Sequence, residues 1–226
     1  MTKRIERQLD KFRYQNQPLN LNLGVLILTG VCSFLIVIAT FTQFDFTHFV
    51  LPFDAFSYIG EDFKNPTIMA HFMKHYRYIP QIPAIMFIVA LLGRKFGITS
   101  VLIYVLVGIF FAPVFALGGG FQYVFQYGFG YILAYVPAVF FAGSILTSGL
   151  TYRNMAQATL VGVLTIHLFG ILYMLFIATL QRENASLILG WISAQSGAKI
   201  LYDLLFGFIA MILAKYTKKA LWVAIG

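Results

Sequence analysis

The chain has 226 residues, of which 60% are hydrophobic and only 11% are charged, and its mean hydropathy is +0.81. These values lie far outside the range of soluble domains and indicate an integral membrane protein. Because one span needs about 20 apolar residues, the length allows about six spans and leaves no room for a soluble domain. The single cysteine, Cys32, excludes an intramolecular disulfide, a cysteine-rich metal site and a C-x-x-C redox pair.

Apolar runs predict an all-α membrane protein of six transmembrane helices. We expect the helices near 23–43, 82–97, 98–117, 129–150, 157–180 and 199–214. The domain organisation is then one six-helix transmembrane domain over 23–214, with a long external loop at about 44–80. Residues 1–22 form a charged cytoplasmic segment that we expect to be retained, and residues 215–226 form a cytoplasmic tail.

Basic residues favour one side of this predicted bundle. With six spans, the two termini and the loops after the second and fourth spans share a side, which holds eleven basic residues against two acidic ones. The positive-inside rule places both termini in the cytoplasm, and anionic lipid headgroups account for the net charge of +8 without a nucleic-acid partner. The eleven residues are Lys3, Arg4, Arg7, Lys11, Arg13, Arg94, Lys95, Arg153, Lys215, Lys218 and Lys219.

The long loop and a glycine-rich stretch fall on the external side. The loop is too apolar to stay solvated, so we expect a lid or a partly helical cap. Gly118, Gly119 and Gly120 end the third span, and Gly128 and Gly130 begin the fourth. Glycines let the backbone leave a helix and approach a ligand closely, and membrane-depth backbone of this kind is tolerated only against protein or a water-filled cavity. We therefore expect an outward-facing ligand pocket.

Polar residues near this side are the candidate ligand contacts. Asp203, about one turn into the last apolar run, is the strongest, because a carboxylate at membrane depth is costly and retained mostly for a partner or ligand. The alternative for Asp203 is a salt bridge with Lys199 at i−4. Tyr131 fits a ligand contact or a membrane-interface tyrosine, and the glycines fit pocket shaping or helix termination. Further candidates are Gln81, Gln122 and Tyr123, with Lys74, Arg77 and Lys199 as cations for a carboxylate ligand.

Histidines and serines offer alternative chemistry. His71 and His75 have the i, i+4 spacing that presents two imidazoles to one metal on a helix, but no third ligand is evident, so we expect no metal site. His167, inside the fifth span, fits an interhelical hydrogen bond. An intramembrane enzyme using His71, His75 and Asp203, or a hydrolase using Ser144, is disfavoured because no nucleophile has a base at credible spacing. A structural membrane subunit is a further alternative.

Two stretches carry motifs in a fixed order. The first is IPQIPAIMFIVALLGRKFGITSVLIYVLVGIFFAPVFALGGG from Ile79, followed by GFGYILAYVPAVFFAG, and the second is YDLLFGFIAMILA over 202–214. The proline-flanked entry, LLG, the basic pair, Y-x-x-x-G and PVFA-x-GGG resemble the BioY family, the membrane-embedded substrate-capture components of energy-coupling-factor (ECF) biotin transporters. Gly130 and Tyr131 match the family's GGY, with Phe129 replacing the first glycine. The first 78 residues match poorly.

The resemblance implies a six-helix bundle with both termini inside and an external pocket that binds biotin with high affinity. It implies uptake through a transmembrane coupling protein and a pair of ATPase subunits. The chain itself has no G-x-x-x-x-G-K-[ST] loop, so we expect no ATP hydrolysis and no cofactor of its own. We therefore predict a multi-pass protein of the cell (plasma) membrane that is not an enzyme.

Two positions depart from the family's pattern. Asp203 matches the last-span aspartate, which implies that it accepts hydrogen bonds from the ureido N–H groups of biotin, but Phe206 stands where the family has a lysine. Lys199, one turn earlier, is a candidate substitute. Phe206 also motivates the alternative of another vitamin or a biotin precursor as substrate. In the first span, Thr29 and Ser33 are a weak equivalent of the A-x-x-x-A spacing against which the coupling protein packs.

Overall fold

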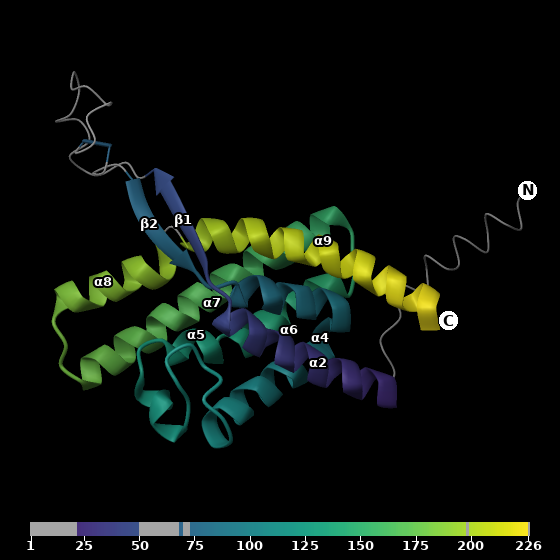
Figure 1. The fold of residues 1–226 in the computed structure, drawn as a ribbon, viewed down its shortest axis with the longest axis horizontal. Helices are drawn as coiled ribbons and strands as arrows, with labels where there is room; N and C mark the ends of the chain where they lie inside the picture. The colour runs from purple at the N-terminus through teal and green to yellow at the C-terminus, as the bar shows by residue number, and fades with distance from the viewer. Residues whose placement is uncertain (1–21, 50–67, 70–72, 198, 226) are drawn as a thin grey trace, which may run out of the picture.

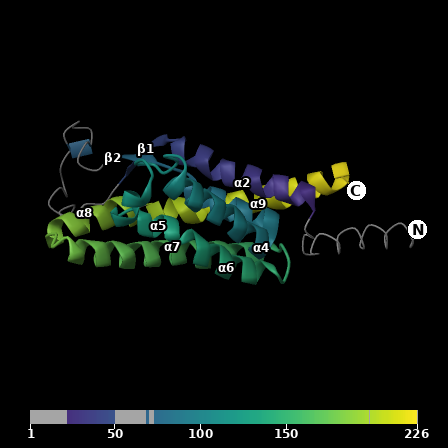
Figure 2. The same cartoon turned by 90° about the horizontal axis from the view of Figure 1, so that it is seen from below.

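The computed structural model describes residues 22–49, 68–69, 73–197 and 199–225. The long helices pack side by side along a common direction (Figure 1, Figure 2). Residues 1–21 of the predicted N-terminal segment lie outside the described residues. The elements are α2 (Leu23–Phe41), β1 (Phe44–Phe49), β2 (Met73–Tyr78), α4 (Gln81–Phe110), the 3-10 helix η2 (Phe121–Phe125), α5 (Phe129–Leu133), α6 (Tyr135–Leu146), α7 (Tyr152–Leu180), α8 (Ala185–Ser196) and α9 (Lys199–Ile225).

Five helical stretches in the described part of the chain are long and apolar enough to cross a membrane. Their outward faces are apolar, as on α7, where exposed leucines recur every four residues. Such a stripe fits contact with lipid tails, and the chain is a multi-pass membrane protein. The stretches are Leu23–Phe41, Gln81–Phe110, Phe129–Leu146, Tyr152–Leu180 and Lys199–Leu221.

The helix α4 folds back on itself at Gly93. There the backbone takes a φ of 75°, a left-handed value that glycine adopts without a Cβ clash. A Cβ built on Gly97 would lie 3.5 Å from the Cα of Val89, and the side chains of Gln81 and Tyr104 are hydrogen-bonded at 3.3 Å. These last two residues would be about 35 Å apart in a straight helix. The predicted break at 97–98 is therefore wrong by several residues, because Gly93 makes the turn.

Other predicted boundaries also differ. The third span ends at Phe110 and not near 117, so Gly118, Gly119 and Gly120 lie in the loop that follows and do not end the helix. The fourth stretch is divided into α5 and α6 at Ala134 and ends at Leu146, before the expected 150. The fifth begins earlier than expected, because the Thr151 side chain caps the first turn of α7. The last helix continues to Ile225, so the predicted tail is helical. Lysines and alanines are good helix formers, which explains the extension of α9. The helix α8 was not predicted.

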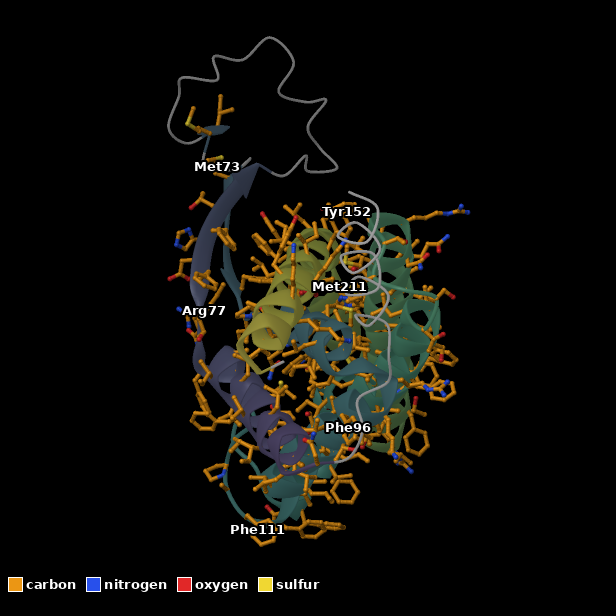
Figure 3. The ribbon with its side chains drawn as sticks, turned by 90° about the vertical axis from the view of Figure 1, so that its right-hand side faces the viewer. Met73, Arg77, Phe96, Phe111, Tyr152 and Met211 are labelled. Carbon is orange, nitrogen blue, oxygen red and sulfur yellow. The ribbon has the colours of Figure 1, made fainter. Side chains whose placement is uncertain are left out.

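The two ends of the predicted external loop pair as the strands of a β-hairpin, which was not predicted. β1 and β2 pair antiparallel, with Phe44 opposite Tyr78 and Phe49 opposite Met73. Figure 3 shows the strands at the edge of the bundle beside α9. The aromatic residues of these strands recur with a period of two, which is typical of a strand with one packed face. The segments 50–67 and 70–72 lie outside the described residues.

The helix α4 forms the centre of the core. It packs against α2, α6 and α9, and α7 packs against α5, α6 and α9. Glycines allow the close approaches: a Cβ on Gly162 would lie 2.8 Å from Met86 Cε, and one on Gly170 would lie 2.5 Å from Tyr131 Cδ1. Small residues at helix interfaces are typical of membrane bundles, where close packing replaces the hydrophobic driving force.

Thr29 and Ser33 on α2 face the inside of the bundle. Their exposed fractions are 1% and 5%, and the Ser100 hydroxyl on α4 donates to the Thr29 carbonyl oxygen at 2.9 Å. This spacing therefore packs α2 against α4 within the chain. The expectation that it offers a surface to a coupling protein is wrong, because neither side chain lies on the outer surface.

Candidate functional site

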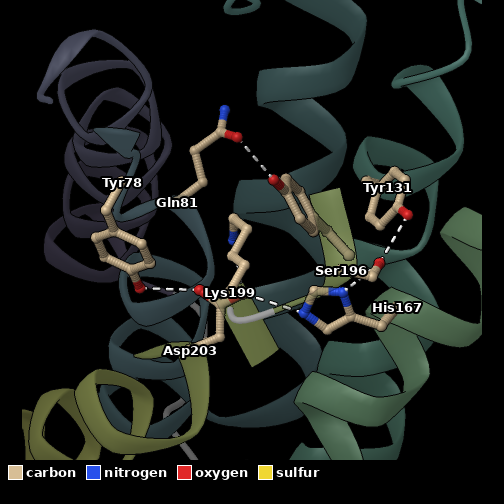
Figure 4. A network of polar contacts seen from close by, with 8 residues as sticks. Tyr78, Gln81, Tyr131, His167, Ser196, Lys199 and Asp203 are labelled. Carbon is tan, nitrogen blue, oxygen red and sulfur yellow. Dashed lines mark hydrogen bonds and ion pairs between the residues drawn. The ribbon is translucent and has the colours of Figure 1, made fainter. Parts of the chain in front are cut away.

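Asp203 is fully buried one turn into α9 and lies at the centre of a hydrogen-bonded network (Figure 4). Its Oδ1 accepts a hydrogen bond from the Tyr78 hydroxyl at 2.8 Å. Its Oδ2 accepts one from Lys199 Nζ at 2.6 Å and lies 3.1 Å from His167 Nε2. Hydrogen bonds to an ionised acceptor are about twice as strong as neutral ones, so three donors can hold an ionised carboxylate firmly at this place.

The network continues from His167 to two further elements. His167 Nδ1 lies 2.9 Å from Ser196 Oγ at the end of α8, and Ser196 Oγ lies 2.8 Å from the Tyr131 hydroxyl on α5. All three side chains are more than 90% buried. We call the six residues together the Asp203 network: Tyr78, Tyr131, His167, Ser196, Lys199 and Asp203. It joins β2, α5, α7, α8 and α9 at one place.

Charge balance explains how a carboxylate is tolerated there. Lys199 is one turn from Asp203 on the same helix, and its side chain is 13% exposed while that of Asp203 is fully buried. The salt bridge considered from the sequence is thus present, and it compensates a charge that would otherwise be costly to bury. The Lys199 ammonium also lies 5.4 Å from the centre of the Tyr78 ring. A carboxylate offers about four lone-pair positions, and the described residues take three.

The order Ser196, His167, Asp203 places a hydroxyl, an imidazole and a carboxylate in line. Lys199 Nζ and His167 Nε2 both lie against the same carboxylate oxygen, so this order fits holding the carboxylate in place better than proton abstraction. Ser144, considered from the sequence as a nucleophile, accepts instead from Arg94 Nη1 at 3.2 Å. The hydrolase alternative based on Ser144 has no base beside it in the described structure.

A second network surrounds Gln81 at the start of α4. Gln81 Nε2 donates to Thr40 Oγ1 at 2.7 Å and to the Tyr104 hydroxyl at 3.3 Å, and Gln81 Oε1 accepts from the Tyr135 hydroxyl at 3.1 Å. We call these four residues the Gln81 network. It contains no charged group and ties α2, both halves of α4 and α6 together. Among the described residues, no hydrogen bond joins Gln81 to the Asp203 network, although both lie in the region of Figure 4.

An aromatic cluster covers one side of the Asp203 network. The rings of Phe46, Tyr202 and Phe206 are nearly parallel, with centroids 5.4 to 6.2 Å apart, and the Tyr78 ring packs obliquely on Tyr202 and Phe206. We call this group the aromatic cluster. Phe206, at the position of the family's lysine, thus holds the β-hairpin against α9. Its side chain supplies packing where the resemblance implies a charge.

The glycine-rich stretch forms a tight loop between α4 and α5. Gly118 and Gly120 have φ values of 125° and 87°, and a Cβ on Gly119 would lie 2.7 Å from the Pro113 Cα. The loop therefore needs glycine for its own conformation. Tyr123 is buried, whereas Gln122 is exposed. Tyr123 packs against Phe115 and Phe129, with its ring centroid 4.8 Å from that of Phe115 and 6.1 Å from that of Phe129.

The remaining candidates lie apart from the Asp203 network. A Cβ on Gly130 would lie 2.3 Å from the Tyr173 Cβ, so Gly130 allows α5 to pack against α7. Arg77 pairs with Asp45 at 3.6 Å on the exposed hairpin. The side chain of Lys74 lies outside the described residues. Of the predicted residues, the structure brings together Asp203, Lys199 and Tyr131.

His71 and His75 do not form the helical pair that a metal site needs. His75 lies on β2, where its Nδ1 is 2.9 Å from Thr47 Oγ1, and His71 lies outside the described residues. In the part of the chain that the structure describes, no three histidine, cysteine or acidic residues gather to hold a metal ion. The i, i+4 spacing has this meaning only on a helix, because side chains four apart on a strand are far from one another.

Three members of the Asp203 network were not predicted as ligand-site residues: Tyr78, His167 and Ser196. His167 carried a usable signal, since ionisable residues inside spans are rare and mark functional sites. It was assigned to an interhelical hydrogen bond, and its bond to Asp203 from another helix fits that prediction. Tyr78 and Ser196 carried none, because a tyrosine or serine near a membrane interface is common.

Comparisons with known proteins place this fold. A curated relative from Lysinibacillus sphaericus named "Probable biotin transporter BioY" is 31% identical over 86 residues, which are 37% of this chain and 44% of the relative. The alignment thus spans less than half of that relative. A solved structure described as the S-component for biotin from an ECF-type ABC transporter has a TM-score of 0.61 at 19% identity, covering 88% of this chain and 95% of that one, which shows a shared fold. The sequence model of the BioY family matches residues 71–222, and the chain belongs to the BioY family.

Proposed function

We propose that the chain captures biotin with high affinity and acts in its uptake as the substrate-binding component of an ECF-type transporter. The observation that carries the proposal is Asp203, a fully buried carboxylate held by three donors in a member of the BioY family. The names of the similar proteins support biotin as the ligand.

The chemistry of the ureido ring suits this site. A ureido group presents two N–H donors and one carbonyl acceptor. Asp203 Oδ1 has a lone-pair position that no described residue takes, and Lys199 has ammonium protons beyond the one directed at Oδ2. We infer that a ureido N–H donates to Asp203 and that the ureido oxygen accepts from Lys199. Lys199 then replaces the lysine that the family carries at position 206.

Other predicted contacts fit around this pair. The Tyr131 ring and the aromatic cluster offer flat surfaces for a fused-ring ligand. We retain Gln122, Tyr123 and the Gly118–Gly120 loop, together with Gly130, as proposed contacts or walls of the pocket. Gln81 is retained as a wall only, because its amide is hydrogen-bonded within the protein.

We also propose six membrane crossings: α2, the two halves of α4, α5 with α6, α7, and α9. The fold-back of α4 supports this number. Gln81–Phe110 is one of the five apolar stretches, and its two halves then supply two crossings. With a cytoplasmic N-terminus, the cations Arg94, Arg153 and Lys215 lie on the cytoplasmic side, as the positive-inside rule requires. The Asp203 network then lies at the outer end, facing outward, and both termini lie in the cytoplasm.

For energy coupling, we propose an ECF transmembrane coupling protein and ATPase subunits as partners in the plasma membrane. ATP is used only by those partners, since the chain has no phosphate loop. Because Thr29 and Ser33 are buried, we place the partner on other residues.

Equilibrium binding of labelled biotin to the purified, detergent-solubilised chain tests the proposal. We expect tight binding that unlabelled biotin displaces and that riboflavin and thiamine do not. Desthiobiotin, which keeps the ureido group, is expected to compete. Binding of another vitamin in place of biotin by a folded sample would overturn the substrate assignment and favour the alternative that Phe206 motivates.

A further inference from the structure

We propose that His167 is a positioning residue for Asp203, and that the Ser196 hydroxyl on α8 holds His167 in its Nε2–H tautomer. The inference rests on the proposed function in one respect only, the assignment of the ligand contact to Asp203. His167 itself is 2% exposed and lies between the two other side chains, 3.1 Å from Asp203 Oδ2 and 2.9 Å from Ser196 Oγ.

Counting protons fixes the direction of these hydrogen bonds. An ionised carboxylate only accepts hydrogen bonds, and Asp203 forms an ion pair with Lys199 at 2.6 Å, so the proton between His167 Nε2 and Oδ2 resides on the imidazole. A neutral imidazole then accepts at Nδ1, and the only donor within reach among the described residues is the Ser196 hydroxyl. Ser196 Oγ in turn accepts from the Tyr131 hydroxyl. In this series of hydrogen bonds, from Tyr131 through Ser196 and His167 to Asp203, each hydroxyl or N–H donates once to the next acceptor.

The opposite tautomer breaks the arrangement. A proton on Nδ1 would leave Nε2 as a lone pair 3.1 Å from a carboxylate oxygen, a distance too short for a water molecule to lie between them. Buried lone pairs that face each other are costly at low local dielectric. His167 therefore holds Oδ2 on one side, while Lys199 holds it on another and Tyr78 holds Oδ1. These three hydrogen bonds fix the orientation of the carboxylate, and with it the direction of the lone pair on Oδ1 that we assign to the ligand.

Ser196, which fixes the tautomer, lies at the end of α8, a helix that is otherwise little buried. Ser196 is buried, and the other described side chains of α8 are half-buried or exposed. Next to it, a Cβ on Gly197 would lie 2.5 Å from the Ser193 carbonyl oxygen, so the joint between α8 and α9 requires glycine. The Ser196 hydroxyl thus reaches His167 only when the end of α8 packs against α7. The tautomer of His167 therefore depends on this packing.

Nitrogen-15 NMR of the imidazole tests the tautomer without any ligand. The chain has four histidines, so replacing His48, His71 and His75 with glutamine leaves His167 as the single labelled ring. We expect a protonated Nε2 and an unprotonated Nδ1, a mixture of tautomers in Ser196→Ala, and the original pattern in Ser196→Thr, which keeps a hydroxyl. An Nδ1–H ring, a doubly protonated ring, or no change in Ser196→Ala would overturn the proposal.

Two amide substitutions of His167, each replacing one of its two ring nitrogens, test whether it positions Asp203. In His167→Gln the amide nitrogen reaches the place of Nε2 and keeps the donor to Asp203, whereas in His167→Asn it reaches only the place of Nδ1. We expect biotin affinity to fall less than about tenfold in the glutamine variant and at least about tenfold further in the asparagine variant. Equal losses in both would mean that His167 only fills space. If the unsubstituted chain binds no biotin, the proposed function fails, and the NMR result still decides the tautomer.

Discussion

The Asp203 network and the Gln81 network lie at the same end of the molecule and are both buried, yet they differ in charge. The first contains Asp203 and Lys199 and joins the hairpin to α5, α7, α8 and α9. The second is neutral and ties α2, both halves of α4 and α6 through Thr40, Gln81, Tyr104 and Tyr135. The Gln81 amide uses both N–H groups within the protein.

This difference suggests a different role for each network: the Gln81 network holds the helices together, and the Asp203 network binds the ligand. A neutral, satisfied network contributes modestly to stability and leaves little capacity for a ligand. A buried ion pair is weak evidence for stability, since well-packed apolar residues often do as well. Keeping a carboxylate with an open lone-pair position at membrane depth is therefore better explained by a ligand. The two networks should respond differently to substitution.

Asp203→Asn should give the largest effect on binding. The substitution keeps the shape of the side chain and removes its charge, so the charge-assisted contact to a ureido N–H is lost and Lys199 is left uncompensated. We expect biotin affinity to fall at least about 100-fold, which corresponds to about 2.8 kcal/mol. Equilibrium binding measures it, with thermal unfolding as the control for folding. A variant that binds like the unsubstituted chain would remove Asp203 from the ligand site.

Lys199→Met should weaken binding about 10-fold to 100-fold, because the ureido oxygen loses its donor and Asp203 loses its counter-ion. Lys199→Arg keeps the charge and serves as the matched control. Adding Phe206→Lys to Lys199→Met restores a cation on α9 near Asp203, and we expect recovery of about tenfold. If that double variant stays as weak as Lys199→Met, Lys199 does not stand in for a lysine at position 206.

Gln81→Leu should show the reverse balance. It leaves the hydroxyls of Thr40, Tyr104 and Tyr135 without their amide partner, so we expect the free energy of unfolding to fall by about 1–3 kcal/mol. Affinity for biotin is expected to stay within about threefold. Thermal unfolding and binding on the same sample give both numbers. A tenfold loss of affinity with unchanged unfolding would instead make Gln81 a ligand contact.

Tyr127→Phe should have the smallest effect and tests whether polar contacts outside both networks matter. The Tyr127 hydroxyl donates to Glu183 Oε1 at 2.8 Å, and this bond raises the pKa of Tyr127 above its ordinary value of about 10. The contribution is thus present below pH 10 and lost as the pH rises through the higher pKa. We expect a Tm difference of at most about 2 °C at pH 7 that shrinks above pH 10. A difference that grows with pH would contradict this assignment.

Part of the site was predictable because its cost is visible in the sequence. Asp203 and Lys199 are charges inside an apolar run one turn apart, and Tyr131 is fixed by the motif around Gly130. Tyr78, His167 and Ser196 were missed as site residues, since their partners lie 125, 36 and 65 residues away in the chain. Sequence spacing carries no information at such separations without a known fold.

The fold divides in the same way. The apolar runs determine that the chain spans a membrane several times, because hydropathy over about 20 residues is a local property. They do not determine where a helix turns back, which depends on the φ of Gly93, nor that a loop pairs as strands, which depends on the register of Phe44 against Tyr78. The amino-acid sequence by itself thus determined the membrane environment, the family resemblance and the buried charge. Only the tertiary structure decided which donors surround that charge, because hydrogen bonds form between groups that packing brings within about 3 Å.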